Sequence, residues 1–414
     1  MSTAGRYREG LGAFSRNARL FIWGGLFNGL GMSVFSLLFN LYLKEQSFTE
    51  TSIGQILAAG SLGAAIAAVP AALVLERVRT KFVMIWSTVL SCACYVLMVL
   101  AGDVPMIRLM SLSATMFVTF YRIASSPFLM TESGEGERIY VFSVNSAVGM
   151  LSSLMGFLFG GMLPGLFLVT GLAGDTAAAQ EYSLYFAVAA SLLAVIPFSR
   201  IEGDSPAPRA PGGFVHKLKS YDWNVIRRLM IPKILVGLGA GLVIPFMNLY
   251  FRNEFGLDPP KIGFYFSLMQ VGLFLGMLSA PMLTRRYGMV GSIVLTELFS
   301  VPFMLVLALT RNLALAVAAF VMRGMLMNMN LPISANFEME IQKPSDRPFT
   351  NAVSAIAWNG SMTLSAAAGG AIIERYSFAF SFYVTIVFYL LSAGSYWLLL
   401  GRRGSGKGAS AAAV

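Results

Sequence analysis

Residues 29–44 read GLGMSVFSLLFNLYLK, and residues 237–252 read GLGAGLVIPFMNLYFR. Both stretches place Asn-Leu-Tyr eight residues after Gly-Leu-Gly and end on a basic residue. The offset between the copies is 208 residues here and becomes 209 after a loop that is one residue longer in the second copy. At that offset, Gly160-Gly161 corresponds to Gly369-Gly370. An offset that holds from residue 29 to residue 161 indicates the internal duplication of a unit of about 200 residues.

The composition predicts that the duplicated unit lies in a membrane. The chain of 414 residues is 56% hydrophobic and only 12% charged, whereas soluble domains carry about 25% charged residues. Because so few charged residues are not enough to cover a water-facing surface, we expect the lipid bilayer to surround most of the chain. A helix needs about 20 residues to cross the hydrocarbon layer. Twelve long apolar runs predict twelve such helices, six in each half: 20–43, 51–75, 82–102, 106–130, 139–174, 182–199, 234–251, 262–284, 288–310, 312–337, 348–373 and 376–401.

The basic residues predict the orientation. If the N-terminus is cytoplasmic, 21 of the 30 Lys and Arg residues lie in inner segments, six in outer loops and three within helices. This asymmetry follows the positive-inside rule. We therefore expect a multi-pass protein of the inner or plasma membrane with both termini in the cytoplasm. The same placement explains the net charge of +10 without a nucleic-acid partner.

A linker is expected between the two halves. Residues 201–213 contain three prolines and three glycines, a composition typical of a flexible connection. The predicted organisation is a basic cytoplasmic tail (1–19), a six-helix bundle (20–200), a cytoplasmic linker (201–228), a second six-helix bundle (229–401) and a cytoplasmic tail (402–414).

Six plus six helices around a long middle loop resemble the major facilitator superfamily. The family's signature between helices 2 and 3 has counterparts at Gly63, Glu76 and Arg77, although Ala72 stands where the family has a second glycine. The resemblance implies an all-α membrane fold of two pseudo-symmetric bundles, and a secondary transporter that exposes a midplane site to either face in turn. It also implies a gate at the inner helix ends, in which acidic and basic residues join the halves. The gate candidates are Glu76, Arg77, Lys81, Glu132, Arg138, Glu340 and Arg347.

Two arginines within predicted helices are the first candidates for a substrate site. Arg122 and Arg323 each lie in the fourth predicted helix of their half. A charge at mid-membrane costs about 2.5–3.5 kcal/mol, and arginine does not deprotonate, so each requires an anion, carbonyl groups or a wet cavity. In the resembling family the fourth helices line the central cavity, which implies contacts with an anionic group of the substrate. A structural arginine bonded to helix-end carbonyls is the alternative.

The resemblance also implies a role for Arg122 in proton coupling. Arg122 matches the arginine of a helix-4 motif tied to coupling in that family, although Ser125 and Ser126 replace the motif's downstream Gln and Gly. Glu297 is the acid deepest within a predicted helix, and burial favours its neutral form, which makes it a candidate proton carrier. The alternative for Glu297 is a protonated, hydrogen-bonded structural residue, because the third helix of a half is usually peripheral in the family. Lys233, near the inner end of helix 7, is expected to extend toward the interface.

Further polar and aromatic residues complete the predicted substrate site. Four methionines lie between residues 322 and 329, and flexible methionines suit a pocket that adapts to amphipathic ligands. The remaining candidates are Asn28, Gln55, Tyr121, Asn145, Asn248, Gln270, Asn328, Asn330, Trp358 and Asn359.

The sequence favours transport over catalysis. It contains no HExxH, Walker or CxxC motif, so we predict no enzyme activity, metal or cofactor. Helix 5 keeps the glycines of the family's antiporter signature at Gly156 and Gly160-Gly161, but Phe157 replaces its proline. The preferred prediction is a monomer that exports an amphipathic drug-like or lipid-like small molecule, coupled to protons. The alternatives are a transporter of a small organic anion and a non-transporting membrane receptor.

Overall fold

The computed structural model describes residues 14–134, 137–203, 222–342 and 347–404, with the backbone alone at 347–349 and 402–404. Within these ranges the chain is helical and contains no strand. The helices are α2 (Arg16–Glu45), α3 (Glu50–Leu75), α4 (Thr80–Leu100), α5 (Val104–Thr131), α6 (Arg138–Val169), α7 (Thr176–Leu192), α8 (Val195–Ser199), α9 (Trp223–Val243), the 3₁₀ turn η1 (Ile244–Phe246), α10 (Met247–Phe255), α11 (Pro259–Leu309), α12 (Leu313–Ile341), α13 (Arg347–Arg375) and α14 (Phe378–Gly404). The predicted tails and most of the predicted linker lie outside the described residues.

The twelve predicted membrane helices are confirmed within the described residues. Ten segments are long and apolar enough to cross a membrane, and one of them, α11, is 51 residues long. Gly288 interrupts α11 with φ 69° and ψ 175°, so the segment contains two helices that meet at this residue. Such dihedrals are essentially restricted to glycine. The more polar α13, with 29 residues, supplies the twelfth span.

The contacts divide the chain into two compact units. Unit 1 comprises Met1–Phe48, Ala59–Ala210 and Asp258–Ser267, and unit 2 comprises Thr49–Ala58, Pro211–Leu257 and Leu268–Val414. The units therefore follow the predicted halves except at two short segments, the first turns of α3 and of α11.

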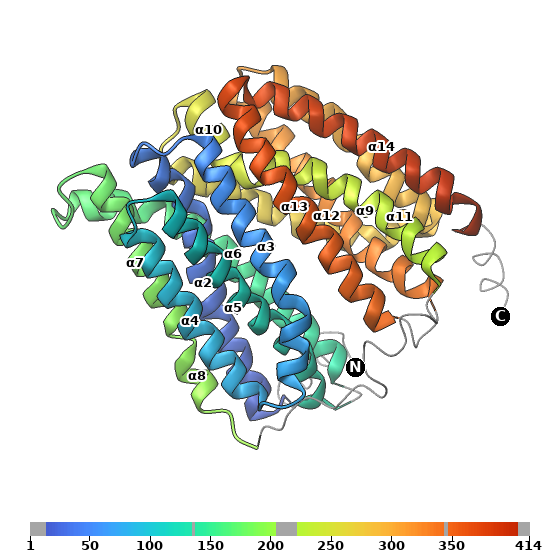
Figure 1. Cartoon of the computed structure of the whole chain (residues 1–414), viewed down its shortest axis with the longest axis horizontal. Helices are drawn as coiled ribbons and strands as arrows, with labels where there is room; N and C mark the ends of the chain where they lie inside the picture. Colours follow the sequence, from blue (N-terminus) through green and yellow to red (C-terminus); the bar gives the residue numbers. More distant parts are fainter. Residues whose placement is uncertain (1–13, 135–136, 204–221, 343–346, 405–414) are drawn as a thin grey trace, which may run out of the picture. The chain divides into compact units, whose positions relative to one another are not determined.

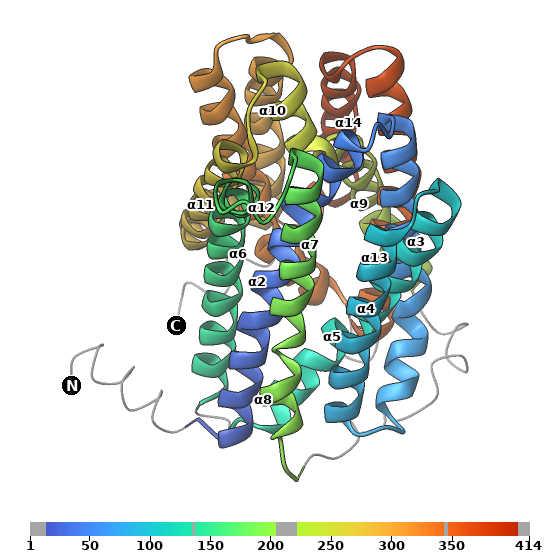
Figure 2. The same ribbon diagram turned by 90° about the vertical axis from the view of Figure 1, so that its left-hand side faces the viewer.

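The two units repeat the same internal packing. In unit 1, α2 packs against α6 and α7 (Figure 2). In unit 2, α9 packs against α13 and α14 (Figure 1). These are the first, fifth and sixth membrane helices of each half, so the element order and the packing both agree with a duplication.

Individual contacts repeat as well. The hydroxyl of Tyr42 donates to the carbonyl of Val99 at 3.1 Å in unit 1. The hydroxyl of Tyr250 donates to the carbonyl of Leu307 at 2.8 Å in unit 2. Both pairs are 57 residues apart, and the two tyrosines belong to the repeated Asn-Leu-Tyr stretch that predicted the duplication.

Candidate functional site

A partly buried ion pair lies inside unit 2. The ammonium of Lys233 on α9 lies 2.6 Å from Oε1 of Glu338 on α12. Ser354 on α13 donates to Oε2 of Glu338 at 3.0 Å and accepts a hydrogen bond from Lys233. Glu338 is 6% exposed, so three helices meet around a carboxylate that is nearly cut off from solvent. The ammonium of Lys233, which is expected to extend toward the interface, bonds Glu338 and Ser354, and its place relative to a bilayer stays a prediction.

A second carboxyl lies deeper in the same unit. Glu297 is fully buried and follows Gly288 by nine residues, which corresponds to about 14 Å along a helix. Asn330 of α12 donates to its Oε1 at 3.4 Å, while its Oε2 has no hydrogen-bond partner among the described residues. No basic side chain in the described part of the chain forms an ion pair with Glu297. A charge on this carboxyl would therefore have no counter-charge among the described residues.

One face of α12 connects these groups. Asn330, Ser334 and Glu338 are spaced by four residues, and residues at this spacing lie on the same side of a helix. The hydroxyl of Ser334 donates to Oδ1 of Asn330 at 2.5 Å. Polar side chains therefore follow α12 from the level of Glu297 to the Lys233–Glu338 pair.

Arg323 lies on α12 seven residues before Asn330 and is buried, with 3% of its surface exposed. Its Nη2 donates to the hydroxyl of Tyr389 on α14 at 3.0 Å, and its Nε has no partner among the described residues. The guanidinium is thus held inside unit 2 by a neutral hydroxyl.

Arg122 differs from Arg323 in its surroundings. Arg122 lies on α5 in unit 1 and is exposed. It forms no hydrogen bond or ion pair with the residues that the structure describes. Its neighbour Tyr121 packs instead, with ring centroids 5.8 Å from Phe198 and 6.3 Å from Phe21.

The other predicted substrate residues are divided between the two units. Asn248 is 3% exposed, and its side chain accepts from the backbone N–H of Leu249. Asn328 and Asn359 each donate to a backbone carbonyl one turn earlier on their own helix. The half-buried candidates are Asn28, Gln55, Tyr121, Asn145, Gln270, Asn328, Trp358 and Asn359.

Several predicted gate residues of unit 1 bond their own unit. Lys81 donates to the carbonyl of Ile201 at 2.7 Å. Glu132 accepts from Ser15 and Asn17, both at 3.1 Å.

The remaining gate candidates show no ion pair within the described residues. Arg138 donates to the backbone carbonyls of Met130, at the end of α5, and of Ser133, at 3.4 and 3.5 Å. Glu340 is exposed, Glu76 is half-buried and Arg77 is exposed. The side chain of Arg347 lies outside the described residues. The gate stays a prediction.

Sequence reasoning missed Glu338, Ser354 and Tyr389. The predicted gate includes Glu340, two residues further along, and not Glu338. The signal was the spacing of Asn330, Ser334 and Glu338, which places Glu338 on the polar face of α12 and Glu340 away from it. No group of His, Cys, Asp or Glu side chains among the described residues is arranged to hold a metal ion.

Comparisons with known proteins agree on the family. The family model described as Major Facilitator Superfamily matches residues 21–231 and again 229–413. No functionally curated protein matches the sequence.

Solved structures show the same fold at low sequence identity. A mutant of the nucleoside transporter NupG is 14% identical, with a TM-score of 0.77 over 93% of this chain and 100% of that chain. The D-xylose-proton symporter is 16% identical, with a TM-score of 0.72 over 92% and 97%. A bacterial homologue of the human lysosomal transporter Spinster, inward-facing and occupied, is 15% identical, with a TM-score of 0.72 over 94% and 96%. Two matches of one family model, one in each half, together span nearly the whole sequence, and the chain therefore belongs to the major facilitator superfamily.

Proposed function

We propose that this chain is a proton-coupled secondary transporter that binds an amphipathic small molecule carrying an anionic group. Coupling is assigned to Glu297, and the substrate's anionic group to Arg122. The observation that carries the proposal is the fully buried Glu297 carboxyl, which has no ion-pair partner and one oxygen without a hydrogen bond among the described residues.

Glu297 has the properties that a proton carrier needs. It is a titratable group that is fully buried and has no ion-pair partner among the described residues, so it can take up and release a proton without breaking an ion pair. The polar face of α12 supplies a chain of hydroxyl and amide groups between Glu297 and the Lys233–Glu338 pair. That pair is internally neutral and contributes no net charge to the interior.

The test is proton flux into proteoliposomes that contain the dye pyranine. Taurocholate (an amphipathic sulfonate), p-toluenesulfonate (a small anion) and ethidium (an amphipathic cation) are added in turn. We expect taurocholate to produce the largest flux, with the sign of the pH change giving the direction of transport. Ethidium as the preferred compound would support a cation exporter and contradict the assignment to Arg122. Taurocholate binding without flux would support the receptor alternative.

The variant Glu297→Gln separates coupling from folding. We expect it to lose proton flux and still exchange labelled taurocholate between the two sides at equal pH, because exchange needs no net proton transfer. The matched control is Glu254→Gln, an exposed glutamate in unit 2 that belongs to neither the predicted gate nor the predicted substrate site. Retained proton flux in Glu297→Gln would remove Glu297 from the coupling mechanism.

An exposed guanidinium in a membrane helix supports the substrate assignment. Arg122 is exposed and forms no ion pair within the described residues, so its donors are available to a sulfonate or carboxylate. Losing a charge-assisted bond of about 1.5–3 kcal/mol raises KM by roughly 10- to 100-fold. We expect this effect in Arg122→Gln and not in Arg108→Gln, a matched exposed arginine on the same helix.

A further inference from the structure

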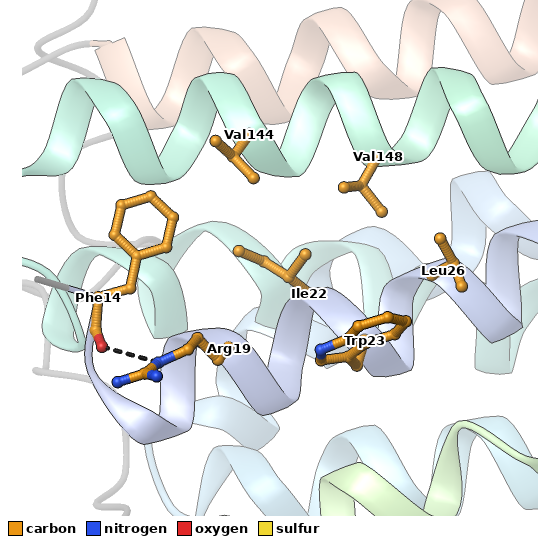
Figure 3. Close-up of a pocket in the computed structure, with 7 residues that line it drawn as sticks. All are labelled: Phe14, Arg19, Ile22, Trp23, Leu26, Val144 and Val148. Atoms are coloured by element: carbon orange, nitrogen blue, oxygen red, sulfur yellow. Dashed lines mark hydrogen bonds between the residues drawn. The ribbon is translucent and has the colours of Figure 1, made fainter. Parts of the chain in front are cut away.

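A groove at the N-terminal end of α2 has apolar walls and a cationic rim. It lies between α2 and the first turns of α6, within unit 1, and encloses about 240 Å³ (Figure 3). Its lining residues are Phe14, Arg19, Ile22, Trp23, Leu26, Val144 and Val148. The transport site proposed above uses none of these residues.

The apolar walls run parallel to the helix axes. Ile22 and Val144 each lie six residues beyond the first residue of their helix, and Leu26 and Val148 each lie ten residues beyond it. At 1.5 Å per residue, these pairs lie about 9 Å and about 15 Å along the helices. Figure 3 shows the valines of α6 facing the side chains of α2 across the groove. The shape fits an extended hydrocarbon chain.

Arg19 places a positive charge at the mouth of the groove. Its Nε donates to the carbonyl of Phe14 at 3.1 Å, which fixes the guanidinium (Figure 3). Its two Nη groups make no hydrogen bond with any residue that the structure describes. They lie in the first turn of α2, where the helix dipole also favours an anion. Two parallel N–H groups of a guanidinium match the oxygens of a phosphate.

The depth of these groups matches the layers of a bilayer. α2 has 30 residues, which is about 45 Å of helix for a hydrocarbon layer of about 30 Å. The first turn of α2 therefore reaches the headgroup region. Trp23, one turn beyond Arg19, is 59% exposed, and tryptophans gather at this interface.

We propose that this groove binds an anionic phospholipid, with its phosphate at Arg19 and one acyl chain between Ile22 and Val148. Charge complementarity favours this occupant over the chain's own residues 1–13, which carry Arg6 and Arg8 against a single acid, Glu9. Basic sites between membrane helices recognise acidic lipid headgroups on the same physical grounds.

Trp23 lies in the groove and reports on it directly. The experiment uses the full chain with Trp23 kept and the other four tryptophans replaced by phenylalanine. The protein is reconstituted in phosphatidylcholine with a minor fraction of phosphatidylglycerol, and bromine, a quencher of tryptophan fluorescence, is placed on the acyl chains of one lipid or the other. We expect the quenching to show about fivefold enrichment of phosphatidylglycerol at Trp23 over the bulk bilayer.

Matched variants test the role of Arg19. Arg19→Gln is expected to abolish the enrichment and Arg19→Lys to retain part of it, because lysine keeps the charge but not the paired N–H groups. Arg16→Gln is the control, because Arg16 pairs with Glu202 at 3.0 Å and does not line the groove. A variant with Trp397 as its single tryptophan, 63% exposed, reports the bulk lipid composition.

Three results would overturn the proposal. The first is equal quenching by the two brominated lipids at Trp23. The second is unchanged enrichment in Arg19→Gln. The third is the same enrichment in the Trp397 variant, which would mean that the lipid gathers around the whole protein and not at this groove. None of these readouts involves transport, so the outcome is independent of the proposed function.

Discussion

The Lys233–Glu338 pair is the residue-scale feature with the largest expected effect on stability. Removing one partner of a buried ion pair leaves the other charge uncompensated and costs about 3–5 kcal/mol. We therefore expect Lys233→Met and Glu338→Gln each to lower the thermal unfolding temperature in detergent strongly. The double variant is expected to recover most of the loss. Arg16→Gln, which breaks an ion pair whose side chains are 64% and 72% exposed, is expected to change stability little. Additive losses in the double variant would contradict the pairing.

Arg323 depends on one hydroxyl. Tyr389 is 1% exposed and accepts the 3.0 Å hydrogen bond from the buried guanidinium. Tyr389→Phe leaves those donors without their acceptor, so we expect a loss of about 1–3 kcal/mol in unfolding free energy. Tyr383→Phe on the same helix is the control, because Tyr383 is 39% exposed. Equal melting temperatures for the two variants would mean that another group compensates Arg323.

The sequence identified the buried charges better than their partners. Glu297 and Arg323 stand out because a charge inside a long apolar run is rare. Ser354 and Tyr389 carry no such signal, since hydroxyl residues are common in membrane helices and only the folded chain brings these two within hydrogen-bond distance of Glu338 and Arg323. The sequence also did not show the surroundings of the two arginines. Arg122 and Arg323 each lie in the fourth membrane helix of their half, yet Arg122 is exposed and Arg323 is buried.

At the scale of elements, the glycines of α6 form a packing surface for α2. A Cβ on Gly156 would lie 2.8 Å from the carbonyl oxygen of Leu30 and 2.6 Å from Cβ of Ser33. Gly156→Ala therefore forces α2 and α6 apart, and we expect a cost of about 1–3 kcal/mol. In Gly149→Ala, on the same helix, the new Cβ meets no described atom within 4 Å, so that variant is expected to melt at or above the wild-type temperature. The thermal unfolding temperatures of the two variants, measured under the same conditions, test this difference, and equal temperatures would contradict it.

The helices themselves could be predicted because hydrocarbon imposes their length and their lack of charge. The positions at which these helices are interrupted could not be predicted. The run 234–251 was expected as one helix, and it contains α9, the 3₁₀ turn η1 and α10. Conversely, the expected runs 262–284 and 288–310 join in α11 and change direction only at Gly288. The interruptions depend on the backbone conformation near Pro245 and at Gly288, and a hydropathy pattern contains no information on backbone conformation.

At the scale of the whole molecule, the duplication preserved burial while the chemistry diverged. At the offset of 209 residues, Glu297 corresponds to Thr88 and Glu338 corresponds to Leu129. Both counterparts are as buried in unit 1, with 2% and 1% exposure, as the two glutamates are in unit 2, with 0% and 6%. The fold therefore accepts an uncharged residue at each position, and the charges of unit 2 are not a requirement of the architecture.

The first turns of α3 belong to unit 2, although the rest of that helix belongs to unit 1. Glu50 accepts a hydrogen bond from Asn253 at 3.0 Å, and the N–H of Thr51 donates to Glu374 at 2.9 Å. Close packing accompanies these bonds, since a Cβ on Gly370 would lie 2.2 Å from the carbonyl oxygen of Glu50. α3 is thus one helix whose first turns and remaining residues fall in different units.

Alternating access requires the two units to move, so we expect the contact between Glu50 and Asn253 to open during each cycle. In a background with Cys92 and Cys94 replaced by alanine, the pair Glu50→Cys and Asn253→Cys is joined by a short thiol cross-linker. Taurocholate-driven proton flux is expected to fall to the level of protein-free vesicles and to return on reduction. The control pair, Glu254→Cys and Ser377→Cys, lines the same cavity of about 270 Å³ but lies wholly outside the first turns of α3. Cross-linking this control is expected to leave flux unchanged, because both residues move with unit 2. Undiminished flux in the cross-linked Glu50–Asn253 pair would mean that these turns stay with unit 2 throughout the cycle and that α3 bends between Ala58 and Ala59 instead.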